Sequence, residues 1–337
     1  MAARMRIVSG RMFVPVMVLG LFLCSCQKDE LPIDSDSAAI DFSVEQTKSS
    51  VTSVDGMKTA ALVVNGTVGT TTLFSGQTVE WSSASSGWVY TPTKFWKANS
   101  THKFRALWPA SALSTTTTYS DNLTSATVSD FTVSSVQASQ VDLLMSDITT
   151  VTTGSSVTGQ SAASLNFRHI LCKVLLKIKQ RNDDDDVFLI TGITLTGMKD
   201  NGSYTVGTGN ATSGTWNTSG SMVLTCTKNY ATPGLDLSAT GVKGNYQSVW
   251  SDGLLLIPQA ISGDVLANID YKVTHGTDTR TKSVSLHLPK PSGKDGWEPG
   301  MSYTYQIVMS EQYNIMFSNP IVEPWGTAQA SGTIVIK

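Results

Sequence analysis

The sequence has few charged residues: Asp, Glu, Lys and Arg make up 15% of 337 residues, with 24 basic against 26 acidic side chains. Soluble domains usually carry about 25% charged residues. This composition excludes a disordered polyelectrolyte and a basic nucleic-acid-binding protein, and no apolar run is long enough to cross a bilayer as a helix. Thr, Ser and Gly, which suit strands and turns, replace the missing charges. The composition therefore predicts an all-β protein of about two domains.

The sequence also lacks a helical stripe with caps. Apolar and polar residues alternate instead, as expected for strands with one buried face, for example over residues 170–178, 265–273 and 301–309. Clusters of Gly, Asn, Ser and Thr separate these rows and predict turns. We interpret the chain as two β-sandwich domains in series, residues 39–180 and 183–337.

The first 25 residues have the features of a signal peptide. Three arginines precede an apolar run from Met12 to Leu23, which is too short to span a membrane as a helix. The following Leu-Cys-Ser-Cys resembles a bacterial lipobox, with Cys26 as the lipidated residue. Ordinary secretory cleavage, which leaves Cys26 as a free thiol, is the alternative. Residues 26–38 form a polar tether, and its acidic start at Asp29-Glu30 resembles a signal for export to the cell surface.

Two cysteines remain in the predicted folded body, Cys172 and Cys226. Each falls on the apolar side of an alternating row, so we expect both to be small buried residues. A disulfide between them is the alternative in an oxidising compartment.

Four consecutive aspartates, Asp183 to Asp186, follow the predicted first domain. Adjacent carboxylates repel one another, so we expect a solvated linker. A calcium site is the alternative, because hard cations take several oxygen ligands.

Motifs for catalysis are missing. The four histidines, His102, His169, His275 and His287, lie in separate segments without metal-site spacing, and there is neither a nucleophile elbow nor a phosphate loop. His169 and His287 are expected to point outward. The sequence predicts no enzyme, no cofactor and no metal, although a surface hydrolase with convergent carboxylates in a cleft is one alternative.

Aromatic residues cluster at Trp81, Trp88, Tyr90 and Trp96. Exposed, they would form a platform on which sugar rings stack, as in a surface glycan-binding lipoprotein. Buried, they would fill a sandwich core, which is the usual place of aromatics in strands.

The order of several motifs resembles the fimbrillin family of Bacteroidetes. The motifs are residues 102–109 (HKFRALWP), 165–174 (LNFRHILCKV) and 254–259 (LLLIPQ), followed by Trp325 and residues 334–336 (IVI). The resemblance implies two tandem transthyretin-like domains in a structural subunit of type V pili, surface fimbriae that support adhesion and biofilm formation. It also implies neighbouring subunits as partners, the outer membrane as anchor through lipid on Cys26, and a host or bacterial surface receptor.

The family's assembly mechanism is the removal of the first strand by a trypsin-like protease, after which a strand from a neighbour fills the open groove. By this resemblance the removable strand carries Ile40, Phe42 and Val44, and the cleavage sites are Lys48 or Lys58. The donor strand carries Ala328, Ala330, Ile334 and Ile336 on one face.

One departure from the family pattern concerns cleavage. Well-known members are cut after an Arg, but this chain has no Arg between Cys26 and Arg105. An uncleaved, lipid-anchored subunit at the base of a fimbria, or an accessory subunit at its tip, is therefore an alternative.

Overall fold

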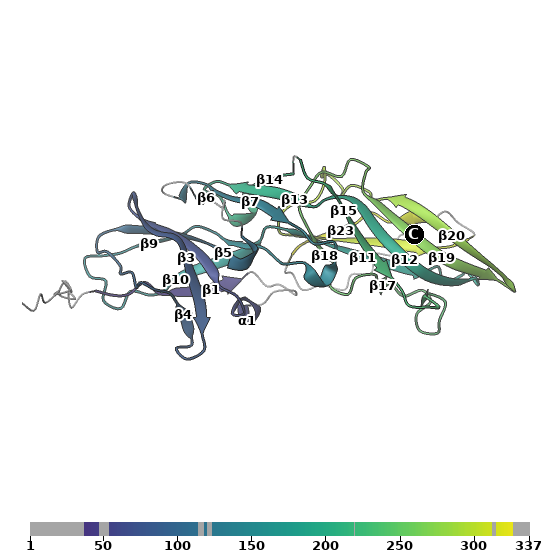
Figure 1. Ribbon diagram of the computed structural model, residues 1–337, viewed down its shortest axis with the longest axis horizontal. Helices are drawn as coiled ribbons and strands as arrows, with labels where there is room; N and C mark the ends of the chain where they lie inside the picture. The colour runs from purple at the N-terminus through teal and green to yellow at the C-terminus, as the bar shows by residue number, and fades with distance from the viewer. Residues whose placement is uncertain are drawn as a thin grey trace, which may run out of the picture. The chain divides into compact units, whose positions relative to one another are not determined.

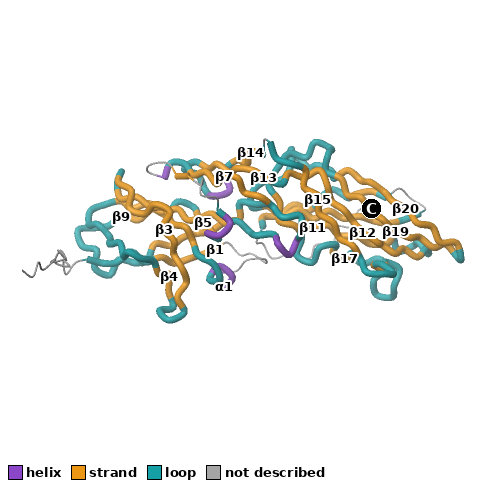
Figure 2. Tube along the Cα trace, viewed as in Figure 1, coloured by secondary structure: helices purple, strands orange, loops and turns teal. Residues whose placement is uncertain are grey.

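Strands account for most of the described backbone (Figures 1 and 2). The computed structural model describes residues 37–46, 54–113, 118–119, 123–218, 220–311 and 315–325. In these ranges the only α-helix is the single turn α1, Val54–Met57, and short 3₁₀ turns include Ala110–Ala112, Gln137–Ser139 and Ala211–Ser213. The predicted all-β class is confirmed. None of the described helices is long and apolar enough to cross a membrane.

The first sheet covers the smaller of two hydrophobic clusters. Its strand order is β1, β10, β8, β5, β2, β3, β4, with β9 beside β5. Alternate residues such as Val64, Phe104 and Leu165 lie in this cluster, because successive side chains of a strand face opposite sides. The strands are β1 Phe42–Gln46, β2 Leu62–Val68, β3 Thr71–Ser82, β4 Gly87–Val89, β5 Thr101–Trp108, β8 Leu144–Ser146, β9 Thr149–Thr152 and β10 Ala163–His169.

Two further sheets enclose the larger cluster as a β-sandwich. One has the order β17, β11, β21, β22, with β18 on β11 and β23 on β21, and the other has β15, β12, β19, β20, with β16 on β12. Leu176 of β11 and Ile193 of β12 are buried in the same cluster. The strands are β11 Cys172–Gln180, β12 Val187–Lys199, β15 Val223–Asn229, β16 Leu235–Asp236, β17 Gln247–Ser248, β18 Leu254–Leu256, β19 Leu266–His275, β20 Asp278–His287, β21 Met301–Met309, β22 Met316–Phe317 and β23 Ile321–Pro324.

Strand β11 packs with the strands that follow it in sequence. It pairs with β17, β18 and β21, and its buried side chains lie in the larger cluster. The residues of β10 that precede it lie in the smaller cluster. The division into domains at 39–180 and 183–337 stays a prediction, and the packing of β11 supports moving the boundary to residues 170–171.

A fourth, smaller sheet has the order β14, β13, β7, β6, with bounds Thr215–Asn217, Asn201–Val206, Ala126–Thr132 and Thr118–Tyr119. The loop after β13 is tied to the first sheet. Arg105 of β5 is fully buried, and its guanidinium donates to the carbonyl oxygens of Gly207 and Gly209, each at 3.0 Å. Asp147 accepts the backbone N–H of Ala211 at 2.7 Å and pairs with Arg168 at 2.9 Å. We call Arg105, Asp147 and the loop 207–211 the Arg105 clamp.

The sheet of β15, β12, β19, β20 and β16 carries short polar side chains on one face, and these side chains bond across strands. Hydroxyl pairs join Thr194 to Thr227 at 3.2 Å and Thr196 to Thr225 at 2.7 Å. On the neighbouring pair of strands, Ser283 bonds Asp270 at 2.7 Å and Ser285 bonds Asn268 at 2.6 Å. We call these eight residues the hydroxyl face. The apolar residues between them, such as Ile193 and Ile269, point to the opposite, buried side.

Candidate functional site: the first strand and the core beneath it

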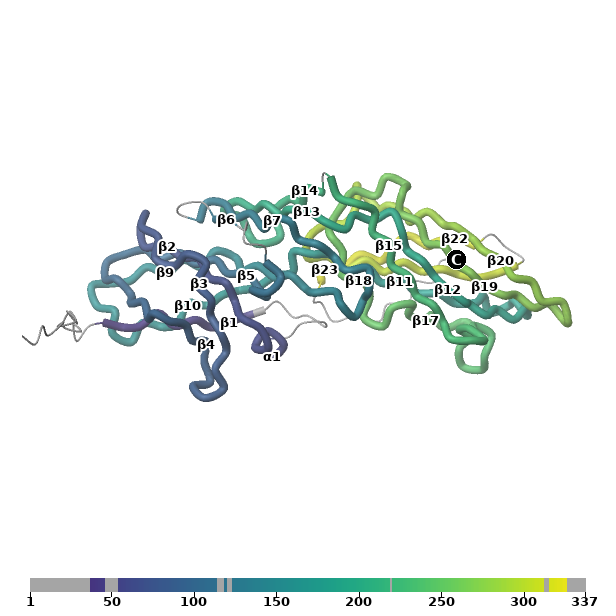
Figure 3. Tube along the Cα trace, viewed as in Figure 1, coloured from purple at the N-terminus to yellow at the C-terminus, as the bar shows by residue number. Residues whose placement is uncertain are grey.

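Strand β1 lies at an edge of the first sheet, and β10 is the only described strand that pairs with it (Figure 3). The two strands are parallel, with Phe42 opposite Ala163. The segment just before β1 is held on its other side by a short stretch of backbone. Ile40 donates its N–H to the carbonyl of Lys94, and Trp96 donates to the carbonyl of Ala38, both at 2.9 Å. β1 and the segment before it are thus held by strand β10 and by residues 94–96, which we call the strap.

The side chains of this segment enter the smaller cluster at alternate positions. Ile40 is fully buried and Phe42 is 5% exposed, whereas Val44 is partly buried. The Phe42 ring contacts Phe74 and Phe104 with centroids 5.5 Å apart in each pair, both edge to face. Burying each of the first two side chains contributes about 1.5–3 kcal/mol. Removing the strand would therefore leave an apolar groove along β10.

Of the two candidate cleavage sites, only Lys58 lies among the described residues. Lys48 lies outside the described residues. Lys58 follows α1 directly: its ammonium lies 2.8 Å from Asp55 and 4.3 Å from the centroid of the Trp81 ring. Its N–H donates to the Asp55 carbonyl, and the N–H of Thr59 donates to Gly56, both at 3.2 Å. The peptide bond after Lys58 thus belongs to a hydrogen-bonded turn.

The candidate donor residues Ala328, Ala330, Ile334 and Ile336 lie outside the described residues, as do Cys26, the signal peptide and most of the tether. The last described residue, Trp325, is well anchored. Its ring stacks on His169 with centroids 3.8 Å apart, and its backbone N–H donates to the Gly300 carbonyl at 2.7 Å. Trp325 thus lies beside the end of β10.

The outward orientation predicted for His169 is wrong. The side chain is 2% exposed and its Nδ1 lies 2.9 Å from Asp142. The alternation of residues 170–178 does not extend back to it, because β10 ends at His169 and β11 begins at Cys172 in another sheet. His169 shares the buried side of β10 with Leu165 and Phe167. His287 is exposed, as predicted.

The solvated linker predicted at the four aspartates is met at Asp183 and Asp185 and is wrong at Asp184 and Asp186, which are buried. Asp184 is 1% exposed and accepts bonds from the hydroxyl of Ser310 at 2.7 Å and the N–H of Glu311 at 3.1 Å. Asp186 is 8% exposed and contacts His275 at 2.5 Å. Asp183 and Asp185 face solvent. Among the described residues, no group of three or more His, Cys, Asp or Glu side chains is placed to hold a metal ion.

The aromatic cluster at Trp81 to Trp96 does not form an exposed platform. Trp88 and Trp96 are buried in the smaller cluster, and the Tyr90 hydroxyl donates to the Ile40 carbonyl at 2.7 Å. Trp81 is partly exposed, but its neighbour Trp88 and the Lys58 ammonium lie against it. These residues support the core and the segment before β1.

The two cysteines of the body are free and buried, as predicted. Both lie in the larger cluster, although the predicted bounds 39–180 and 183–337 would assign them to different domains. Burial raises the pKa of Cys226 to about 11 and that of Cys172 well above its usual value.

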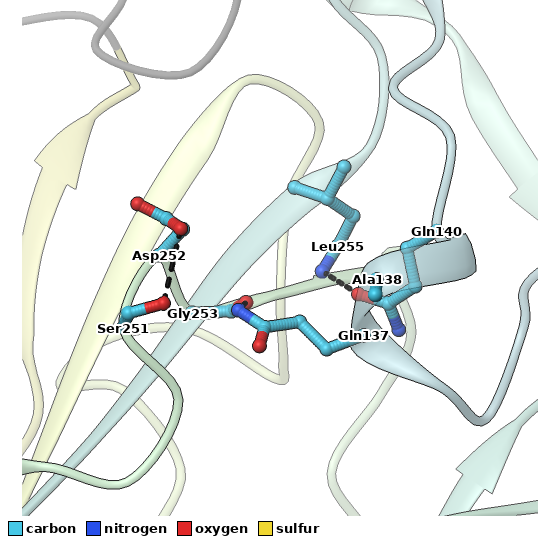
Figure 4. A pocket seen from close by; sticks show the side chains of 7 residues that line it. All are labelled: Gln137, Ala138, Gln140, Ser251, Asp252, Gly253 and Leu255. Atoms are coloured by element: carbon cyan, nitrogen blue, oxygen red, sulfur yellow. Dashed lines mark hydrogen bonds between the residues drawn. The ribbon is translucent and has the colours of Figure 1, made fainter.

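A polar cavity of about 500 Å³ lies between the 3₁₀ turn Gln137–Ser139 and the loop before β18 (Figure 4). The side chain of Gln137 reaches across it and donates to the Gly253 carbonyl at 2.9 Å. Gln140 accepts the Leu255 N–H at 2.8 Å. The two amides thereby join the turn to the sandwich, and the cavity wall contains no aromatic ring.

The chain is similar to known proteins in both sequence and fold. The sequence pattern of the fimbrillin-like family matches residues 44–325, which is most of the chain. The chain belongs to the fimbrillin-like family. Among solved structures, a fimbrial protein from Bacteroides vulgatus matches with a TM-score of 0.58 at 17% identity, over 85% of this chain and 99% of its own. A protein assigned to cell adhesion from Bacteroides uniformis matches with a TM-score of 0.49 at 18% identity, over 87% of this chain and 99% of its own. A comparison with curated proteins finds no match.

In this fimbrillin-like chain, sequence reasoning missed three parts of the site. It missed the strap around Lys94 that holds Ile40, the stacking of Trp325 on His169, and the Arg105 clamp. Each of these contacts joins segments that are far apart in sequence, so no local sequence pattern predicts it. Arg105 alone gave a signal, since it occupies a strand position between two apolar residues.

Proposed function

We propose that this fimbrillin-like chain is a structural subunit of a surface fimbria of the type V class, supporting adhesion and biofilm formation. It is exported as a lipoprotein through Cys26 and held at the outer membrane, with its surface exposed. A protease then removes the first strand, and the C-terminal strand of a neighbouring subunit takes its place. The chain performs no catalysis and binds no nucleic acid.

The observation that carries this proposal is the position of β1. An edge strand can be exchanged without breaking a ladder on both sides, because its backbone groups have one paired neighbour. Its loss leaves unpaired those N–H and C=O groups of β10 that face β1, beside pockets vacated by Ile40 and Phe42. Unpaired backbone next to apolar pockets is the arrangement that accepts an added strand.

The spacing of the proposed donor matches these pockets. Ile40, Phe42 and Val44 follow one another at every second position, and so do Ile334 and Ile336. In an extended strand such residues share one face, so two isoleucines reach adjacent pockets. Each contributes about 1.5–3 kcal/mol on burial. In such a strand Ala328 and Ala330 would share this face. The backbone hydrogen bonds between the donor strand and β10 would stabilise the complex further.

Between the two cleavage candidates we favour Lys48. Proteases cut preferentially at exposed segments that can adopt an extended form. The turn at Lys58 is fixed by backbone bonds and by the pairing with Asp55, so cleavage there requires the turn to open. A cut after Lys48 falls beyond β1 and releases the whole strand.

The alternative within the same family is an uncleaved anchor or tip subunit. It is favoured by the absence of Arg between Cys26 and Arg105. In that case β1 stays in place, and the chain can donate its C-terminal strand but accepts none.

Limited proteolysis tests the proposal. The chain from Gln27 onward is treated with a low dose of trypsin, its new N-terminus is read by mass spectrometry, and its size is followed by gel filtration. We expect a new N-terminus at Ser49 and SDS-resistant ladders. Lys48→Ala should block both, whereas the matched Lys58→Ala should change neither. An intact monomer in the parent chain would support the anchor or tip alternative and refute the exchange.

A chain that ends at Trp325 provides a second control. It should lose β1 at the same rate but form no ladders, because it lacks the donor. Ladders formed by this shortened chain would show that another segment joins the subunits.

A further inference from the structure

A second cavity is lined by β14 and by residues 258–260 and 293–299, and no residue of β1 lines it. Its volume is about 400 Å³, within the usual range of about 300–1,000 Å³ for ligand sites, and it lies between β14 and the loop 293–299. Trp216 and the two prolines Pro258 and Pro299 give it apolar walls, and Lys294, Asp295 and Glu298 give it a charged rim. We call it the Trp216 pocket.

Trp216 differs from the other tryptophans in its surroundings. Of the described tryptophans, only Trp216 and Trp81 are partly exposed. Trp216 lines this pocket together with the buried Trp297, whereas Trp81 does not. Its indole N–H donates to the Ile170 carbonyl at 2.7 Å, and its ring packs on Tyr204 with centroids 5.2 Å apart. The ring is thus fixed in one orientation, so a ligand that packs on it binds without the entropy loss of ordering this side chain.

The opposite wall is also preformed. Ala260 and Gly296 form an antiparallel bridge, and the N–H of Trp297 donates to the Gln259 carbonyl at 2.9 Å. A side chain at Gly296 would overlap the Gln259 carbonyl oxygen, so glycine permits the close approach that shapes this wall.

The rim offers both donors and acceptors. The Lys294 ammonium lies 2.9 Å from a Glu298 oxygen, and their side chains are 49% and 43% exposed. An ammonium has three donors and a carboxylate has about four acceptor sites, so both groups keep capacity for a ligand. Asp295 adds a second carboxylate, and Lys290, 3.9 Å away, balances its charge. The rim therefore has no net positive charge that would attract an anion.

We propose that the Trp216 pocket binds a neutral saccharide unit of a glycan. A pyranose ring has a face of C–H groups that packs on an indole, and its edge carries hydroxyls that both donate and accept. This combination matches an aromatic wall beside an ammonium–carboxylate pair. For a phosphorylated or uronic sugar, each ammonium at the rim is already paired with a carboxylate, and a purely apolar ligand would leave the remaining hydrogen-bonding capacity of the rim groups unused. The inference is independent of strand exchange.

Saturation-transfer NMR on the chain from Gln27 onward tests this site. The probes are glucose, galactose, mannose and N-acetylglucosamine, with glucuronic acid as the acidic counterpart. We expect transfer to the ring protons of at least one neutral sugar, and weaker transfer to glucuronic acid. No transfer to any of the four neutral sugars, or stronger transfer to glucuronic acid, overturns the proposal.

Variants locate the binding. Trp216→Ala should weaken it at least about tenfold, since one lost ring contact of about 1.4 kcal/mol corresponds to that factor. Glu298→Gln keeps the shape of the rim and should weaken binding about three- to tenfold, the effect of one hydrogen bond. Trp81→Ala, at the other partly exposed tryptophan, should leave binding unchanged. Equal binding by the parent, Trp216→Ala and Glu298→Gln chains would place the sugar elsewhere and refute the site. If Trp216→Ala does not fold, Glu298→Gln alone decides.

Discussion

The indole ring of Trp325 lies parallel to the imidazole of His169, with ring centroids 3.8 Å apart and planes 10° apart. His169 ends β10, the strand on which β1 is held, and its Nδ1 contacts Asp142 at 2.9 Å. Trp325 is therefore in contact with the last residue of the strand that pairs with β1. In the proposed assembly, this contact connects the donor end of a subunit to its own acceptor groove.

Trp325→Ala tests how strongly this contact holds the fold. Trp325 is 6% exposed, and truncating a buried Trp removes transfer free energy and leaves a cavity, so we expect the free energy of unfolding to fall by about 3–5 kcal/mol. Urea denaturation measures it. Trp81→Ala, at a partly exposed ring, is the matched control and should cost less. Equal losses at the two sites would contradict the anchoring role.

Phe42→Ala tests the hold on the first strand. Phe42 is 5% exposed between Phe74 and Phe104, so we expect a loss of about 3–5 kcal/mol in the free energy of unfolding and faster release of β1 by trypsin. Glu45→Ala on the exposed side of β1 is the control and should leave both unchanged. Release of β1 at the parental rate from Phe42→Ala would mean that the backbone ladder alone holds the strand.

Arg105→Lys tests the clamp. Burial lowers the pKa of Arg105, and its two carbonyl partners need the fork of a guanidinium, which a single ammonium cannot reproduce. We expect a loss of about 1–3 kcal/mol from a carbonyl left without a partner, measured by urea denaturation. Lys103→Arg, a partly exposed position on the same strand, should be neutral. A neutral Arg105→Lys would show that the loop 207–211 is held by other contacts.

The two thiols should be inert in the folded protein. Their pKa values are raised by burial, so few thiolates exist at about pH 8, near the usual thiol pKa of about 8.5. We expect no alkylation by iodoacetamide in the native chain from Gln27 onward with Cys26 replaced by Ser. In guanidinium chloride, mass spectrometry should show both cysteines modified. Two unreactive cysteines in denaturant, released by a reductant, would reveal a disulfide instead.

The pair of Asp186 and His275 predicts a pH dependence. Its hydrogen bond to Asp186 raises the pKa of His275 above the usual value of about 6.5. A raised folded-state pKa stabilises the fold below about pH 6.5, and this contribution is lost as pH rises through the folded-state pKa. NMR titration of the imidazole checks the direction. Asp186→Asn should return the pKa of His275 toward its usual value, and an unchanged pKa would contradict the assignment.

The strands and the all-β class could be predicted because alternation is local. The row predicted at residues 170–178 became β11, which begins only at Cys172, and the rows at 265–273 and 301–309 became β19 and β21. The same rule failed at His169, because Ile170 and Leu171 separate two strands of different sheets and the alternation does not continue across them. Local patterns say which side of one strand is buried, but they do not say where one sheet ends and another begins.

The aspartate run shows a second limit. Its charge pattern favours solvent, yet Asp184 is buried because Ser310 and Glu311 supply hydrogen bonds from the end of β21. Partners more than a hundred residues away cannot be found from composition. The stacking of Trp325 on His169 was hidden for the same reason, whereas Ile40 and Phe42, which alternate with polar residues in the sequence, lie in the core.

The hydroxyl face has a consequence for packing between fibres. Its Thr, Ser and Asn side chains bond one another across the strands, and each hydroxyl keeps acceptor capacity for a neighbouring surface. Most of these bonds join neutral groups and attract no counter-ions, so added salt would alter them little. Fimbriae that displayed this face along their flanks would meet through hydroxyl, amide and carboxylate groups rather than apolar side chains, and that contact would depend little on salt.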